Sequence, residues 1–421
     1  MSASDQATRS GPARVDRDFN RLWLGQSLSL VGSQVSVLAI PLTAALTLRA
    51  TPAQMGLLGA AQWLPFLLLS LPAGAWIDQR RRRPLMIAVD LGRASSLAVV
   101  PAAAALGVLT LPLLYASAFV TGVLQVFFEL AYQSYVPVLV GRARLVRANS
   151  RLQASASAAQ VGGPGLAGML AQLVSAPIAV LLDALSYVVS AASVAAIRTP
   201  EPPPTDDEGP RVPLRRSIGE GLRVVVGEPV LRAMAAEAAL FNLFETATLT
   251  LLVLFATREL GIGPGLLGVI LGLGAVGALL GAVAADRLSR RWALGRAMLA
   301  AYLVACVPLL LLPAATGPQG LAAAMLVAAF ALSGFGVSTS QVYVWSVRQS
   351  MVAPGLLARM NAAYRFVVSG TVPLGALVGG TLGSLLGLRG GIAVATLGIA
   401  LAVVPILASP IPTLHDLPEH R

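Results

Sequence analysis

Long runs of apolar residues, separated by short polar or charged segments, make up most of the 421-residue chain. A helix needs about 20 mostly apolar residues to cross the hydrocarbon core of a bilayer. Proline or glycine stands at many of the joins between the runs, where a missing N–H costs least. The pattern predicts an all-α polytopic membrane protein with twelve transmembrane helices. The expected spans are residues 21–48, 53–77, 84–107, 110–138, 149–174, 176–197, 230–257, 263–285, 293–315, 319–347, 357–386 and 390–410.

Arginine divides the connections between these runs into two alternating sets. One set is rich in arginine and includes the four at residues 80–83, whereas the other holds only Arg49, Arg258 and Arg389. Loops rich in positive charge stay on the cytoplasmic side of a membrane. Both termini belong to the arginine-rich set, so we expect both to be cytoplasmic. The first 19 residues lack an apolar signal-peptide core, so the first span is expected to direct its own insertion.

Composition supports a membrane protein and excludes several other classes. Charged residues make up 12% of the chain, against about 25% in an ordinary soluble domain. The net charge is +11, but the arginines form short clusters between apolar runs, so nucleic acid is not an expected partner. The single cysteine lies inside an apolar run, the two histidines lie in the polar tail, and there is no lysine. We therefore expect no metal, no cofactor and no enzyme activity, and an ion gradient in place of ATP as the energy source.

A Pro-rich, charged segment, TPEPPPTDDEGPRVP at residues 199–213, separates six apolar runs from the other six. The sequence LRRSIGEGLRVVV follows at 214–226, and its spacing predicts a short amphipathic helix on the cytoplasmic membrane surface. We expect an N-terminal six-helix half at 1–198, a cytoplasmic linker with this helix at 199–229, and a C-terminal six-helix half at 230–421.

The two halves repeat one another. LVRAN at residues 145–149 returns as LARMN at 357–361, and the constant difference in numbering between these two motifs is called the repeat offset below. GAWIDQRRRRP at 74–84 returns in weakened form as GAVAADRLSRRW at 281–292, again after the second run of its half. Internal repeats of this kind are typical of transporters. The repeat offset also places Gln341 at the position that Glu129 holds in the first half.

The loop at 74–84 resembles the Gly-x-x-x-Asp-x-x-x-Arg-Arg signature of the major facilitator superfamily, and the likeness covers nearly all of the chain. FNRLWLGQSLSLVGSQV at 19–35 and LLDALSYVVSA at 181–191 resemble the branch of the macrolide-efflux proteins and the enterobactin exporter. The resemblance implies a secondary active transporter that works by alternating access. We expect a monomer in the cell inner (plasma) membrane, with membrane lipids and a small-molecule substrate as its partners.

The resemblance also implies a cytoplasmic gate. Asp78 would brace the start of span eleven, and the motif arginine would pair with an acid low on span four, where Glu129 is available. Such pairs would hold the cytoplasmic ends of the halves together while the cavity opens outward. Alternatively the arginines only set topology and contact anionic lipid head groups, which is the preferred interpretation for Arg80 and Arg81. The gate candidates are Gly74, Asp78, Arg82, Arg83, Glu129, Asp286, Arg290 and Arg291.

Acidic residues inside the spans require a structural or functional explanation, because an isolated charge at mid-bilayer costs about 2.5–3.5 kcal/mol. Glu245 lies deepest, about fifteen residues into span seven and beside Asn242. It is either a protonatable carboxylate that faces the cavity or a satisfied hydrogen bond between helices. Asp183 in span six is a second candidate for proton coupling, although packing or hydrogen bonding to span five is the preferred interpretation. Glu237 is expected to be structural, because Arg232 lies about one turn away.

Polar residues elsewhere in the spans suggest a cavity or interhelical contacts. Asp90 and Arg93 are three residues apart on span three and are expected to pair. Span one carries a stripe of serine and glutamine, which either lines a cavity or joins helices by hydrogen bonds. The candidates for cavity lining are Gln26, Ser29, Ser33, Gln125 and Asn242.

These features favour one function over several others. The spans are poor in Asn, Gln and His, which argues against a sugar-type cavity. The leading hypothesis is proton-coupled efflux of an amphipathic or lipophilic small molecule such as a drug, siderophore or secondary metabolite, as in multidrug-resistance antiporters. The alternative is an uptake or lipid transporter of the same fold. A non-transporting membrane scaffold is less favoured, because it does not need a charged loop repeated in each half. A membrane-embedded enzyme is less favoured as well, because Glu245 and Asp183 are too few to form a deep cluster of catalytic groups.

Overall fold

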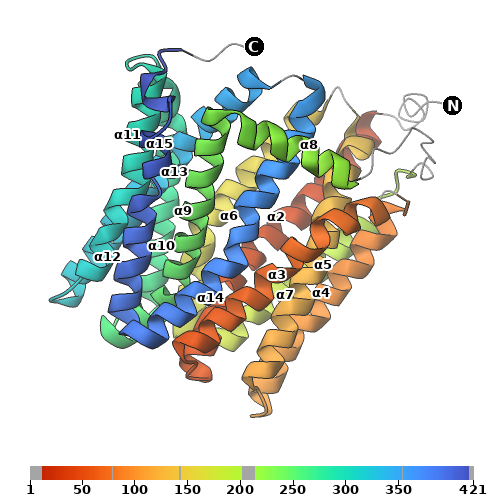
Figure 1. Ribbon diagram of the computed structural model, residues 1–421. Coiled ribbons are helices and arrows are strands. Elements are labelled where there is room, and N and C mark those ends of the chain that lie inside the picture. Colours follow the sequence, from red (N-terminus) through yellow and green to blue (C-terminus); the bar gives the residue numbers. More distant parts are fainter. Residues whose placement is uncertain (1–11, 78, 142–143, 202–213, 353, 417–421) are drawn as a thin grey trace. The chain divides into compact units, whose positions relative to one another are not determined.

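The computed structural model describes residues 12–77, 79–141, 144–201, 214–352 and 354–416 (Figure 1). Within these ranges every regular element is a helix, as the long apolar runs predict. Ten of these described helices are long and apolar enough to cross a membrane, judged by length and composition. Contacts divide the chain into two compact units, Met1–Ala50 with Ala61–Glu208, and Thr51–Ala60 with Gly209–Arg421.

The helices of the first unit begin and end at residues with the expected chemistry. Proline occupies the first turn of α5 and α7, and the Ser175 hydroxyl caps α7 by accepting from the Ile178 amide at 3.4 Å. Gly141 ends α5 with a φ of 71°, which favours glycine. The unit contains α2 (Pro12–Leu42), most of α3 (Pro52–Ile77), α4 (Arg82–Ala105), α5 (Leu111–Val140), α6 (Leu145–Leu173) and α7 (Ala176–Ala195).

The second unit contains α8 (Leu214–Gly227), α9 (Pro229–Leu254), α10 (Pro264–Ser289), α11 (Leu294–Cys306), α12 (Leu311–Ala314), α13 (Gln319–Met351), α14 (Pro354–Leu401) and α15 (Val404–Leu407). α14 leaves helical geometry at Gly387, with a φ of 74°, between the expected eleventh and twelfth spans. The expected ninth span is interrupted by a 3-10 turn, η4 (Val307–Leu310), because Pro308 has no N–H to donate.

The amphipathic helix expected at 214–226 is present as α8, which packs against the beginning of α14. Glu220 forms an ion pair with Arg359 of α14. Gly221 lies directly on the Arg359 carbonyl, because a Cβ at this position would overlap it. A residue larger than glycine would therefore push α8 away from α14.

The internal repeat is visible in the helix ends as well as in the sequence. α3 and α10 begin at positions related by the repeat offset, and so do α4 and α11. The π-helical turns η1 (Thr43–Thr47) and η3 (Phe255–Glu259) keep the same offset. In each, the amide of the following residue, Leu48 or Leu260, donates to the first carbonyl of the turn. The two halves therefore share local geometry at matching positions.

Close contact between α9 and α14, which run side by side in Figure 1, fixes how α9 is turned. Gly379 of α14 lies on the backbone of α9, where a Cβ would come within 2.7 Å of the Ala247 Cα. Gly375 makes a similar approach to Leu243. Only glycine permits helices to come this close. The opposite side of α9, which carries Glu245, is thereby left to face other helices of the unit.

Candidate functional site

The signature arginines of the first half begin α4, and their backbone is capped by Glu201. The Glu201 carboxylate accepts from the Arg82 amide at 2.6 Å and from the Arg83 amide at 3.1 Å. It also lies 3.8 Å from the Arg82 guanidinium, and its side chain is only 6% exposed. A carboxylate here satisfies two of the unpaired donors that every helix leaves at its N-terminus. The sequence did not predict this contact, because Glu201 lies near the start of the segment that was expected to be a linker between the halves.

Replacing Glu201 with alanine is expected to destabilise the protein by about 0.5–2 kcal/mol, the usual cost of losing a helix cap. Glu201→Gln keeps an acceptor oxygen for the same amides, so it should retain part of this stability. Thermal unfolding of the purified protein in detergent measures both changes. Equal melting temperatures for Glu201→Ala and the wild type would show that the cap contributes nothing.

The pairing expected between the signature arginines and Glu129 is absent from the described residues. The Arg83 guanidinium donates to the carbonyls of Val194 at 3.2 Å and Ala195 at 2.7 Å, at the end of α7. Glu129 instead accepts from the Gln125 amide at 3.0 Å, one turn away on α5. Helix-end carbonyls supply the acceptor that Arg83 needs. Asp78, the central residue of the expected gate, lies outside the described residues.

The second copy of the motif forms a local ion pair at the end of α10. Asp286 and Arg290 are one turn apart and lie 3.1 Å from each other, with side chains that are 69% and 76% exposed. Arg291 is exposed as well. An exposed pair of this spacing contributes only about 0.3–0.5 kcal/mol. In the first copy, a Cβ built on Gly74 would meet no described atom within 4 Å.

A buried arginine lies at the centre of the polar residues of the first unit. Arg93 of α4, which is 1% exposed, forms an ion pair with Asp90 and donates to the side-chain amide oxygen of Gln125 on α5. Its guanidinium lies between two rings, 4.0 Å from the centroid of Phe128 and 4.1 Å from that of Tyr187. The expected pairing of Asp90 and Arg93 is confirmed. A carboxylate, an amide and two aromatic faces together hold the cation.

The polar stripe of the first span joins α2 to α7. The Gln26 amide donates to the Ser190 hydroxyl at 2.8 Å, and the Ser33 hydroxyl lies 3.0 Å from that of Tyr187. Ser29 is buried in the same face of α2. Of the two interpretations left open by the sequence, the contacts of Gln26 and Ser33 are those of hydrogen bonds between helices.

Asp183 of α7 is buried, with 1% exposure, and is held by hydroxyl groups. It accepts from Ser186 at 3.2 Å and, more weakly, from Ser33 of α2 at 3.5 Å. Hydrogen bonds offset much of the free energy needed to bury a carboxyl group. Its expected hydrogen-bonding role is present, although the partner helix is α2, whereas the sequence suggested span five.

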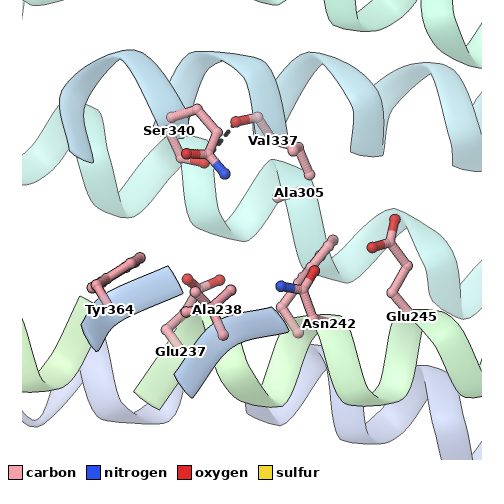
Figure 2. Close-up of a pocket in the computed structure, with 11 residues that line it drawn as sticks. Glu237, Ala238, Asn242, Glu245, Ala305, Val337, Ser340 and Tyr364 are labelled. Carbon is pink, nitrogen blue, oxygen red and sulfur yellow. Dashed lines mark hydrogen bonds between the residues drawn. The ribbon is translucent and has the colours of Figure 1, made fainter. Parts of the chain in front are cut away.

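The second unit contains a cavity of about 110 Å³ between α9, α11, α13 and α14. Figure 2 shows Glu237, Asn242 and Glu245 along α9, facing Ser340 of α13. Asn242 and Glu245, which the sequence singled out, thus lie in one cavity. The polar residues of its lining are Glu237, Asn242, Glu245, Ser340, Gln341 and Tyr364, and the remaining ones are alanine, valine and phenylalanine.

Two carboxyl groups in this cavity have no ion-pair or hydrogen-bond partner in the described part of the chain. Glu237 is 6% exposed and Glu245 is half-buried. Arg232, the cation expected to pair with Glu237, donates instead to the Val226 carbonyl at 3.1 Å. The partner that the sequence suggested for Glu237 is therefore not used, and its structural role stays a prediction. The available signal was its spacing, since Glu237, Phe241 and Glu245 follow one another every four residues along one side of α9.

A second buried arginine contacts a residue of the cavity wall, but its guanidinium has other partners than the two carboxyl groups of the cavity. Arg348 of α13 is 5% exposed and donates to the Asn361 side chain of α14. Its guanidinium lies 4.0 Å from the centroid of the Tyr364 ring and 4.9 Å from that of Trp345. The expected tenth span ends at residue 347, one residue before Arg348, so the burial of Arg348 was not predicted.

A helical protein with an internal repeat, many helices able to cross a membrane and a cavity lined by two carboxyl groups has the features of a membrane transporter of the two-half type. The profile of the Major Facilitator Superfamily matches residues 22–372, and the chain belongs to this family. The multidrug efflux pump Tap of Mycobacterium tuberculosis is 26% identical over 404 residues, which cover 93% of this chain and 92% of that protein.

Solved structures share the fold. A bacterial homologue of the human lysosomal transporter Spinster, in an inward-facing and unoccupied conformation, is 16% identical and has a TM-score of 0.68. That match covers 95% of this chain and 96% of the homologue. The nucleoside transporter NupG is 13% identical with a TM-score of 0.71, over 93% of this chain and 98% of its own. At these identities the likeness establishes the fold and leaves the cargo open.

Proposed function

We propose that the protein is a secondary active exporter that uses the proton gradient to move amphipathic or lipophilic small molecules out of the cell. The observation that carries the proposal is the Glu245 carboxyl, which lines the cavity of the second unit and has no partner among the described residues. The 26% identity to a multidrug efflux pump, over nearly the full length of both chains, supports export as the direction.

In this proposal the chain is a monomer that crosses the plasma membrane twelve times, with both termini in the cytoplasm. To the ten helices that qualify by length and composition we add α6, whose polar residues lower its hydropathy. We also count the segment from Arg359 to Leu407 as two spans that meet at Gly387. The alternation of arginine-rich and arginine-poor connections supports the orientation.

Proton coupling in this proposal rests on the chemistry of a carboxyl group without a partner. A buried carboxylate is costly unless a cation or hydrogen-bond donors offset its charge, and binding a proton removes that cost. Glu245 has no such partner among the described residues, whereas Asp183 has two serine hydroxyls. Glu245 therefore has the stronger reason to exchange a proton as water reaches the cavity from one side and then the other.

Everted membrane vesicles that contain the protein are expected to accumulate lipophilic fluorescent dyes when respiration acidifies their interior. A panel of cationic, neutral and anionic dyes serves as the set of probes. A protonophore should abolish the accumulation, because the gradient is the only source of energy. Accumulation no greater than in vesicles without the protein, for every dye, would contradict export. Gradient-driven uptake of a dye by right-side-out vesicles would show import, the opposite of the proposed direction of transport.

A further inference from the structure

The cavity of the second unit corresponds to the place where the first unit holds the Arg93 side chain. By the repeat offset, the position in the second half that corresponds to Arg93 is Ala305, which lines the cavity. Gln125 and Phe128, which contact the Arg93 guanidinium, correspond in the same way to Val337 and Ser340 of the cavity wall. The first half thus fills this space with a cation of its own, and the second half leaves it open.

The open space keeps the acidic character of a cation site. Glu237 is 6% exposed, lines the cavity and has no partner among the described residues. None of the residues that line the cavity is basic. Arg348, a buried cation that contacts the Tyr364 ring of the cavity wall, also donates to Asn361 and does not itself line the cavity. A buried carboxylate without a counter-charge is costly, and a bound cation removes that cost.

Aromatic and hydroxyl groups complete the surroundings of Glu237. Phe241 and Tyr364 line the cavity, and aromatic faces attract ammonium groups. The Tyr302 hydroxyl of α11 is within electrostatic range of Glu237, is 2% exposed and has no hydrogen-bond partner in the described part of the chain. In the first unit, Arg93 is held by the same kinds of group, a carboxylate and two rings.

The size of the cavity limits what part of a molecule enters it. Its volume of about 110 Å³ is below that of a cavity of about 150 Å³ that binds benzene in another protein. A methylated ammonium group fits this volume, whereas a whole drug molecule does not. The apolar body of the molecule must therefore remain outside the cavity while the charged group enters.

We infer that this cavity binds the ammonium group of the cargo against the Glu237 carboxylate, so that the exported molecules are amphipathic amines or quaternary ammonium compounds. The inference rests on the proposed function and names its substrate class. Glu245 lies eight residues further along α9, an axial rise of about 12 Å. One carboxyl group can therefore hold the cargo while the other exchanges the proton.

Equilibrium binding to the purified protein in detergent tests this assignment without any gradient. The probes are benzyltrimethylammonium and neopentylbenzene, which have the same shape and differ in the charge of one atom. Isothermal titration, with protein-free micelles as the baseline, should give at least about tenfold tighter binding of the cation. Glu237→Gln should remove this preference. Glu228→Gln, which removes a carboxylate at the beginning of the same helix outside the cavity, should keep it.

Two outcomes would overturn the assignment. They are equal binding of both probes by the wild type, and unchanged cation binding by a Glu237→Gln variant that elutes and melts like the wild type. If that variant does not fold, Phe241→Leu removes an aromatic face and should weaken cation binding about threefold or more. Failure of export is separable, because cation binding with no gradient-driven accumulation of any dye would refute the proposed transport and leave the binding site standing.

Discussion

Replacing Glu245 with glutamine is expected to abolish proton-driven accumulation of substrate while the protein remains folded. Glutamine has nearly the shape of glutamate but carries no exchangeable acidic proton. Glu245 makes no ion pair or hydrogen bond within the described part of the chain, so the substitution breaks no contact there. Everted vesicles with Glu245→Gln should therefore reach the same concentration of dye inside as outside.

The size of this effect follows from the gradient. With one proton exchanged per molecule, about 1 pH unit supports roughly tenfold accumulation, since each corresponds to about 1.4 kcal/mol. Glu245→Gln should lower that ratio to about 1, whatever the external dye concentration. Exchange of labelled for unlabelled dye across the membrane involves no net proton movement, so it should survive in the variant. Exchange therefore separates a lost proton site from a lost transporter.

Two further variants make the assignment specific. Glu228→Gln changes the carboxylate of the residue that precedes α9, outside the cavity, and should keep full accumulation. Asp183→Asn changes the competing buried acid of the first unit, which already has hydroxyl partners. Full accumulation by Glu245→Gln together with its loss in Asp183→Asn would place the proton on α7 and contradict the coupling proposed for α9.

Local sequence patterns predicted much of the fold, because they report local physical requirements. The apolar runs predicted the helices, the spacing at 214–226 predicted α8, and the position of Gly387 between two expected spans coincides with the break in α14. The Asp90–Arg93 pair was predictable for the same reason, since both residues lie on one turn of one helix. The internal repeat was readable in the motifs and recurs in the helix ends.

Contacts between distant residues were harder to predict. Glu201 meets the beginning of α4 from 119 positions away, and no sequence pattern records that approach. The position of Arg232 suggested an ion pair with Glu237, but the Arg232 guanidinium donates to the Val226 carbonyl at the end of α8 instead. The cavity itself depends on Ala305, which occupies the position that Arg93 holds in the first half. This difference is found only when the two halves are compared residue by residue. The candidate site of the second unit therefore lies where the two halves differ.

Removing the Arg93 charge is expected to be the most damaging single change in the first unit. Arg93 is 1% exposed and Asp90 is fully buried, so Arg93→Met leaves a buried carboxylate without its counter-charge. Breaking a buried pair in this way costs about 3–5 kcal/mol. Methionine still fills the space between Phe128 and Tyr187, so the loss of volume adds little. Unfolding of the purified protein, by heat or by titration with denaturing detergent, measures the change.

A double variant separates charge from packing. Asp90→Asn in the Arg93→Met background removes the unpaired carboxylate, so it should restore at least about half of the lost stability. Restoration is incomplete because Asp183 also lies within electrostatic range of Arg93 and loses that partner. In the wild-type background Asp90→Asn should destabilise, since it leaves the Arg93 guanidinium buried without its carboxylate. If the two substitutions were simply additive, the pair would carry no coupling energy, and Arg93 would serve only to fill the space that the second half leaves open.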